Sequence, residues 1–141
     1  MIANIFGMHI GCEISFKLKI ETLSAQLAGV FKGRGTGRYM VKTHDDFNIY
    51  LEDCKLILTS LSKITEEDKA ELRKYCEDNS ILPDFGGLTE KSILYLKNDR
   101  VYVSYRKGKE LALSFKVCMR LAKMGYDIGI CPEENKIVEV E

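Results

Sequence analysis

Apolar and polar side chains alternate regularly between residues 9 and 20 of this chain. The apolar members of the alternation are Ile14, Phe16, Leu18 and Ile20. A period of two is typical of a β-strand with one buried face, and it does not fit a helix. More short runs of β-branched and aromatic residues follow up to Leu61, separated by Thr-Leu-Ser, by glycines and by His-Asp-Asp. We therefore expect four or five antiparallel strands, curled into a small barrel or roll because closure removes open sheet edges.

The segment from Val30 to Thr43 contains three alternating glycines among four basic residues. A phosphate-binding loop needs a lysine after its last glycine and a helix behind the loop. Neither pattern is present, because Gly37 is followed by Arg38 and by the strand-like residues 38–43. The segment is predicted to be a hairpin tip, which leaves open that its basic residues also touch an anionic partner.

The pattern becomes helical after Ile64. Thr65 precedes Glu66, Glu67 and Asp68, which is an N-cap signal and predicts a helix from about Glu66 to Glu77. Residues 92–106 favour a hairpin around Asn98 and Asp99, although a short helix capped by Thr89 is the alternative.

A second helix is predicted between Lys109 and Gly125. Leu111, Phe115, Cys118 and Ala122 form its apolar stripe, and Gly125 supplies its left-handed end. The tail after Pro132 adds one strand or remains loose.

The expected fold is α+β in a single domain, residues 1–141, with a β-rich lobe at about 8–61 and an α/β lobe at about 64–141. Residues 1–7 are expected to be dispensable, because the strand pattern becomes regular only from Ile10.

Charge is balanced overall but not along the chain. Lysine plus arginine and aspartate plus glutamate number 21 each in the 141 residues. Residues 45–90 hold twelve acids and five bases, net −7, whereas residues 91–123 hold nine bases and two acids, net +7. This balance excludes a strong overall attraction to nucleic acid or membranes, but it allows two oppositely charged regions.

The cysteines and histidines favour neither a metal site nor a disulfide framework. Five widely spaced cysteines form no Cys-x-x-Cys pair, and only two histidines are present. With no signal peptide and no apolar run long enough to span a bilayer, we expect a cytoplasmic protein with reduced thiols and no cofactor. His44 beside Asp45 and Asp46 is the best candidate for a catalytic base, but a polar hairpin loop explains His-Asp-Asp without any catalytic role. We therefore predict that the protein is not an enzyme.

Three segments resemble a group of small uncharacterised proteins encoded by phages and prophages of Bacteroidetes-type bacteria. These segments are "MHIGCEI" (8–14), "IYLEDCKLILTSLSKITEEDKAEL" (49–72) and "LAKMGYDIGI" (121–130). The chain departs from the pattern in its basic hairpin and in beginning seven residues before Met8. The resemblance transfers no catalytic residue. It implies an accessory protein that acts in the bacterial host cell by binding and blocking a host protein, such as a nucleic-acid-processing or defence complex.

Two surfaces are candidates for such a role. An acidic surface could pair with the lysines and arginines of a protein partner, and it would comprise Asp45, Asp46, Glu52, Asp53, Glu66, Glu67 and Asp68. The alternative is a small RNA- or DNA-binding protein, in which tyrosine rings stack on bases between basic residues. Its candidate residues are Lys32, Arg34, Arg38, Tyr39, Lys42, Arg100, Tyr102, Tyr105, Arg106, Lys107 and Lys109.

Overall fold

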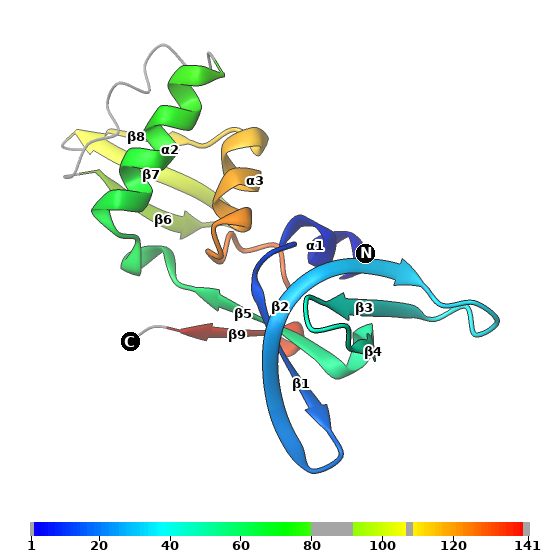
Figure 1. Cartoon of the computed structure of the whole chain (residues 1–141). Helices are drawn as coiled ribbons and strands as arrows, with labels where there is room; N and C mark the ends of the chain where they lie inside the picture. The colour runs from blue at the N-terminus through cyan, green and yellow to red at the C-terminus, as the bar shows by residue number, and fades with distance from the viewer. Residues whose placement is uncertain (1, 80–91, 107–108, 140–141) are drawn as a thin grey trace.

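The fold is α+β, with two sheets and three α-helices among the residues described. The computed structural model describes residues 2–79, 92–106 and 109–139, and only the backbone of Tyr105, Arg106 and Lys109. The elements in chain order are α1 (Ile2–Met8), β1 (Glu13–Leu18), β2 (Glu21–Lys32), β3 (Tyr39–Thr43), β4 (Asn48–Tyr50), η1 (Leu51–Asp53), β5 (Cys54–Thr59), η2 (Leu61–Lys63), α2 (Glu66–Asp78), β6 (Ile93–Lys97), β7 (Arg100–Arg106), β8 (Lys109–Ala112), α3 (Phe115–Lys123), η4 (Glu133–Asn135) and β9 (Lys136–Glu139). Figure 1 shows them as two groups side by side.

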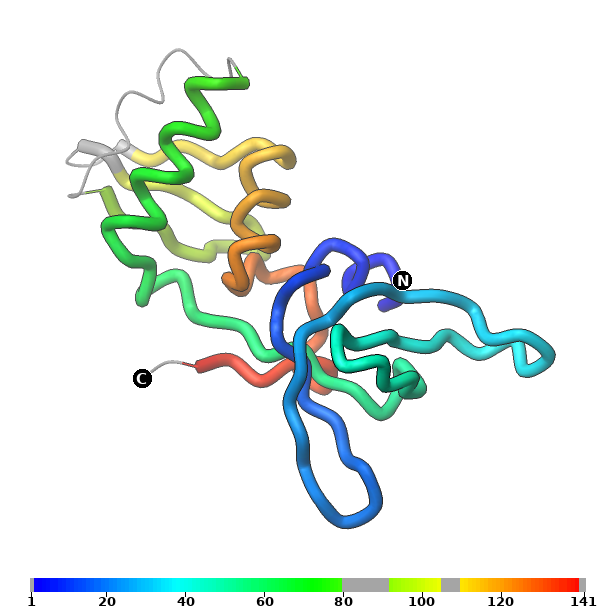
Figure 2. The backbone as a smooth tube through the Cα atoms, viewed as in Figure 1, coloured from blue at the N-terminus to red at the C-terminus, as the bar shows by residue number. Residues whose placement is uncertain are grey.

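The first sheet has six strands in the order β4-β3-β2-β1-β5-β9. Its pairs are antiparallel except for β5 and β9, which run parallel. The sheet curves strongly because the twelve-residue strand β2 bends along its length, with an irregular register between Leu27 and Gly29 (Figure 2). Within the described residues the outer strands β4 and β9 do not pair, so the predicted barrel closure is not confirmed.

The second sheet has the order β6-β7-β8 and carries α2 and α3 on one face. The hairpin alternative for residues 92–106 is confirmed, since β6 and β7 meet at Asn98 and Asp99, whose φ angles are 51° and 60°. Two positive φ angles match the tight reversal expected of Asn-Asp. The linker after α2 and the competing cap at Thr89 lie outside the described residues.

Helix α2 is confirmed, whereas α3 begins later than its apolar stripe predicted. The Thr65 hydroxyl accepts a hydrogen bond from the Asp68 backbone N–H, and α2 extends from Glu66 to Asp78. Leu111 lies on strand β8 instead, and Phe115 is 69% exposed at the start of α3. The buried face of α3 consists of Val117, Leu121 and Ala122.

The first hairpin turns earlier than the sequence indicated. Lys19 has a φ of 60° in the turn between β1 and β2, and the Thr-Leu-Ser expected as a turn lies inside β2. Ile14 and Phe16 are buried as expected, but Leu18 and Ile20 are 46% and 97% exposed. The apolar alternation therefore continues past the core into solvent.

Two hydrophobic cores form, one in each group of elements. The first contains Phe6, Ile14, Phe16 and Leu56, and the second contains Leu72, Val103, Val117 and Leu121. Strand β9, predicted beside the second lobe, returns to the six-stranded sheet. Of the two alternatives for the tail after Pro132, a strand or a loose end, the strand is confirmed.

Helix α1 contradicts the expectation that regular structure begins only at residue 10. Phe6 is 0% exposed and belongs to the first core, together with Ala3. The helix packs against β2 and α3. Residues 2–7 therefore supply core packing, and the expectation that this segment is dispensable is wrong.

Truncation of Phe6 tests this packing. Phe6→Ala should lower the free energy of unfolding by about 3–5 kcal/mol, because it removes a buried ring and leaves a cavity. Asn4→Ala is the matched control on the same helix, since Asn4 is exposed, and it should change stability by about 0.5 kcal/mol or less. Urea unfolding of the two variants measures the difference, and equal stabilities would show that α1 is not part of the folded core.

Candidate functional site

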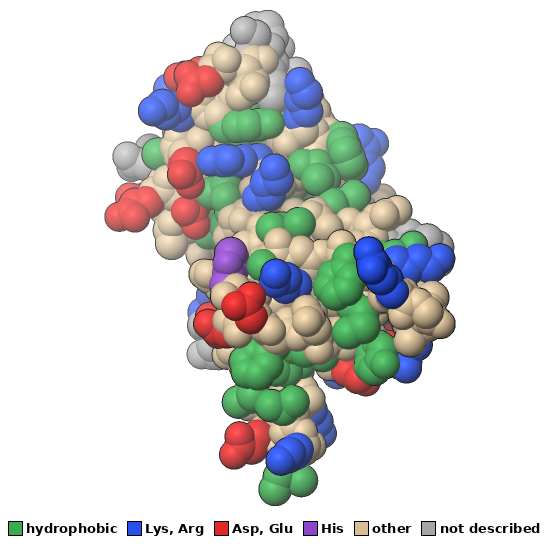
Figure 3. All heavy atoms as spheres, turned by 45° about the vertical axis from the view of Figure 1, so that its right-hand side comes forward, with side chains coloured by type: hydrophobic (Ala, Val, Ile, Leu, Met, Phe, Trp, Pro, Cys, Tyr) green, Lys and Arg blue, Asp and Glu red, His purple; other side chains and the backbone are tan. Residues whose placement is uncertain are grey.

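A hairpin of the first sheet projects from the body with apolar side chains along it. We call the segment from Phe16 to Leu23, which comprises the end of β1, the turn and the start of β2, the apolar arm. Phe16 lies opposite Leu23 and Leu18 opposite Glu21. Because side chains two apart share a strand face, Leu18 continues the face on which Phe16 is buried. Figure 3 shows hydrophobic side chains gathered along the projection at the bottom of the view.

The turn between β3 and β4 lies against the base of the apolar arm. The Phe47 ring packs on Phe16 with 5.7 Å between centroids, and it is 36% exposed. The Thr43 side chain accepts a hydrogen bond from the Phe47 N–H, and the His44 N–H donates to the Gln26 carbonyl. Asp45 and Asp46, two of the predicted acidic residues, are therefore exposed beside the apolar arm.

The basic hairpin between β2 and β3 is confirmed as a hairpin, with φ angles of 80° at Gly35 and 70° at Gly37. Several of its basic side chains are engaged within the protein. Arg38 pairs with Glu52 and stacks 3.6 Å from the Tyr50 ring centroid, whereas Lys42 lies 3.8 Å from Asp46. Lys32 lies 6.0 Å from the Tyr39 ring.

The two candidate surfaces therefore meet at this hairpin. Acids that were predicted to attract a partner lie within reach of bases that were predicted to attract nucleic acid. Asp53 lies exposed beside Glu52 on η1, and Arg34 is exposed at the hairpin tip.

The remaining acidic candidates lie in the other group of elements. Glu66, Glu67 and Asp68 form the first turn of α2. Asp68 accepts a hydrogen bond from the Tyr126 hydroxyl, so it fixes the end of α3 to α2. Burial and this contact raise the pKa of Tyr126 to about 12. The predicted acidic residues thus form two separate groups.

The second part of the basic set lies on the three-stranded sheet. Arg100 and Tyr102 occupy β7, where Tyr102 lies opposite Tyr95 of β6. Tyr95 and Lys97 were missed by the sequence reasoning, although the hairpin register alone would have placed them across from Tyr102 and Arg100. Lys107 and the side chains of Tyr105, Arg106 and Lys109 lie outside the described residues.

The cysteines are mostly core residues, as predicted. Cys12, Cys54, Cys76 and Cys131 are buried and Cys118 is partly buried. Burial raises the pKa of Cys12 to about 11 and that of Cys54 to about 12, so these thiols stay protonated at neutral pH. Among the described side chains, no group of three or more His, Cys, Asp or Glu could hold a metal ion. None of the described helices combines the length and apolar character needed to cross a bilayer.

A buried ion pair lines a groove between the β6–β7 turn and the segment before β9. The groove has a volume of about 580 Å³ and is lined by Asp99, Asp127, Glu133 and Lys136, among others. Lys136 Nζ lies 3.0 Å from Asp127 Oδ2 and 3.6 Å from Glu133. Burial lowers the pKa of Lys136, but Asp127, together with the charges of Glu133 and Cys131, outweighs it and the net change in the pKa is upward. The pair anchors the turn before β9.

The two groups of elements meet at His9, which is fully buried. Its Nδ1 lies 2.9 Å from the carbonyl oxygen of Ala122 in α3, and the Cys12 thiol donates to the same oxygen at 3.3 Å. The Nε2 atom has no hydrogen-bond partner among the described residues. Burial lowers the pKa of His9, against the raising effects of the Ala122 carbonyl and the Asp127 charge.

The lowered pKa predicts a loss of stability in mild acid. When the pH falls below 6.5, the ordinary pKa of histidine, His9 becomes protonated in the unfolded chain but stays neutral in the folded protein. The free energy of unfolding is therefore unaffected by His9 protonation above pH 6.5. It decreases as the pH falls towards the lowered pKa of folded His9, by up to about 1.4 kcal/mol per pH unit. Urea unfolding between pH 7.5 and 5 should show this slope.

Two variants assign the slope to one histidine. His9→Gln should flatten it, whereas His44→Gln should retain it, because His44 is exposed. A slope unchanged in His9→Gln would show that another group causes the acid sensitivity.

Comparison with protein-family models, with curated proteins and with solved structures finds no match for this chain. The phage or prophage origin suggested by its three segments therefore stays a prediction. Any function has to be inferred from the exposed side chains, their charges and their position on the fold.

Proposed function

We propose that this protein is a non-catalytic interaction protein that binds and blocks another protein through the apolar arm. One observation carries the proposal: Ile20 is 97% exposed and Leu18 46% exposed on a hairpin that projects from the body (Figure 3). Apolar groups at a projecting tip add nothing to the core and favour association. A partner that covers them gains the hydrophobic free energy that folding leaves unused.

The surroundings of the apolar arm define the chemistry of the partner. Glu21 lies directly across from Leu18, the exposed Lys17 and Lys19 belong to the same hairpin, and Asp45 and Asp46 precede Phe47 at the base. The complementary surface is an apolar pocket with lysine and arginine where it meets the acids at the base of the arm. Acids at the rim of such an interface accelerate association, and the apolar tip supplies most of the affinity.

The resemblance to phage and prophage proteins gives this proposal its specific form. Proteins that hold nucleic acids present lysine and arginine to phosphates. A projecting arm with acids at its base is complementary to a surface of that kind. The partner we propose is therefore a nucleic-acid-processing or defence complex of the bacterial host, such as a nuclease or CRISPR effector, blocked by occupation of its basic channel in the cytoplasm.

Removal of the apolar tip tests the proposal. The partner is first identified by capture from nuclease-treated host lysate and then purified for a binding measurement. Leu18→Ser with Ile20→Ser should weaken binding at least tenfold, because burial of one such side chain is worth about 1.5–3 kcal/mol. Phe115→Ser is the matched control, since Phe115 is 69% exposed in the other group of elements; it should leave the affinity within twofold.

The acidic rim has its own test against the same partner. Asp45→Asn with Asp46→Asn should slow association and reduce its dependence on salt, and asparagine tolerates the φ of 64° at residue 46. Asp78→Asn, at the end of α2, is the control. Unchanged affinity in the tip variant, or capture that disappears after nuclease treatment, would contradict the proposal.

A further inference from the structure

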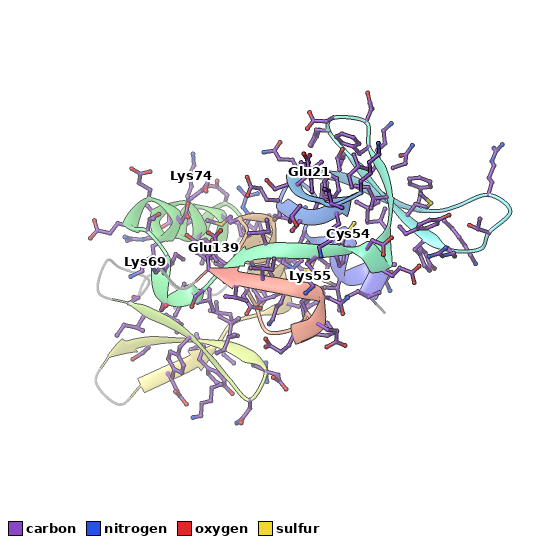
Figure 4. The ribbon with its side chains drawn as sticks, turned by 90° about the horizontal axis from the view of Figure 1, so that it is seen from below. Glu21, Cys54, Lys55, Lys69, Lys74 and Glu139 are labelled. Atoms are coloured by element: carbon purple, nitrogen blue, oxygen red, sulfur yellow. The ribbon has the colours of Figure 1, made fainter. Side chains whose placement is uncertain are left out.

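The three-stranded sheet has helices on one face only. Leu94, Val101, Val103 and Leu113 point into the second core, where they pack with α2 and α3. Figure 4 shows both helices on one side of this sheet and side chains pointing away from them on the other. Ile93, on that other side, is 62% exposed.

The register of β6, β7 and β8 arranges the open face in rows. Tyr95 lies opposite Tyr102, and Tyr102 lies opposite Ala112. Lys97 and Arg100 form the neighbouring row beside the β6–β7 turn. Aromatic side chains therefore occupy the middle of the face and basic side chains one end. The third position of the aromatic row holds only the methyl group of Ala112.

The two rings are already ordered without a ligand. Tyr95 and Tyr102 stack with 6.0 Å between centroids and 18° between ring planes. Glu110 accepts hydrogen bonds from the Tyr95 hydroxyl and, at 2.8 Å, from Lys97. Lys97 Nζ also lies 5.7 Å from the Tyr102 centroid. These contacts hold the rings in place, so a stacking ligand loses little of its affinity to ordering them.

Among the described side chains, Glu110 pairs with Lys97, and Arg100 is exposed next to the exposed Asp99 of the turn. These four charges sum to zero, so Arg100 supplies only a local positive charge at one end of the face. A ligand that combines flat unsaturated rings with a phosphate is complementary to the stacked tyrosines and to Arg100.

We propose that the open face of the three-stranded sheet binds single-stranded nucleic acid. One base stacks beside Tyr102 over the small Ala112, and an adjoining phosphate lies towards Arg100. A single strand is required because the bases of a duplex are stacked on each other and cannot reach a flat sheet. This site is independent of the apolar arm.

The β2–β3 hairpin is less suited to the same ligand. Arg38 is occupied by Glu52 and the Tyr50 ring, and Asp46 lies near Lys42. On the open sheet face Lys97 is likewise paired with Glu110, but the exposed Arg100 lies on the row next to the stacked rings.

Binding of the full chain to a fluorescein-labelled twelve-nucleotide oligo(dT) and oligo(U), followed by anisotropy, tests the proposal. We expect a dissociation constant of about 10⁻⁴ to 10⁻⁶ M at physiological salt, with little preference for sequence. Tyr102→Leu should weaken binding about tenfold, because loss of one stacked base has an effect of this order. Arg100→Gln, an exposed change that leaves the core intact, should lower the salt slope by about 0.7.

Tyr39→Leu and Arg34→Gln on the β2–β3 hairpin are the matched controls and should bind within twofold of wild type. The chain has seven tyrosines and no tryptophan, so quenching of tyrosine emission by unlabelled oligonucleotide gives a second readout that Tyr102→Leu should reduce. No binding at 100-fold molar excess in low salt, equal affinity for duplex, or losses confined to the hairpin variants would overturn the proposal. So would a protein partner whose affinity depends on Tyr102 when the oligonucleotides do not bind.

Discussion

The arrangement of this protein depends on a short run of backbone at the end of α3 that contacts both groups of elements. The Ala122 carbonyl accepts from Cys12 and lies against His9, both in the segment that precedes β1. Three residues later the Gly125 carbonyl accepts from the Thr59 N–H at 2.8 Å, and the Asp127 N–H donates to the Thr59 carbonyl at 2.9 Å. These bonds are buried or lie between backbone groups, so their loss would leave unpaired polar groups in the interior. They fix the three-stranded sheet relative to the six-stranded sheet.

The two proposed binding surfaces lie outside both hydrophobic cores. Helix α1 contributes side chains to the first core, and α2 and α3 contribute side chains to the second. The tip of the β1–β2 hairpin and the face of the three-stranded sheet opposite its helices contribute to neither core. In the first sheet, β2 bends near Leu27 and Gly29 and pairs with β1 at one end and β3 at the other. The two hairpins consequently project in different directions (Figure 2).

Local signals predicted the elements whose ends are set by local chemistry. The cap at Thr65, the turn at Asn98 and Asp99 and the left-handed Gly125 each determine a boundary through their own backbone or side-chain preferences. The helix α1 has no such signal, because its seven residues are held by burial of Phe6 in a core assembled from distant strands. The start of α3 was misjudged for a related reason. Leu111 and Phe115 fit a helical period, but cross-strand pairing holds Leu111 in β8 and Ser114 precedes the helix.

The surface chemistry was harder to predict than the elements, since charge along the chain does not translate into charge in space. Arg38 and Glu52 are fourteen positions apart, yet the β3–β4 pairing brings them into contact and reduces the field of both candidate patches. Tyr95 and Tyr102, in contrast, become one stacked pair only because the hairpin register sets them opposite each other.

Net charge is a weak guide to partners in a chain of this kind, since exposed pairs of opposite sign cancel it locally. Apolar and aromatic side chains carry no charge, so a neighbouring ion cannot neutralise their tendency to bind a partner. Ile20 at the tip of the arm and Tyr102 on the open sheet face therefore retain their capacity for contact, and recognition is expected to depend on such residues, with charge adjusting rate and salt dependence.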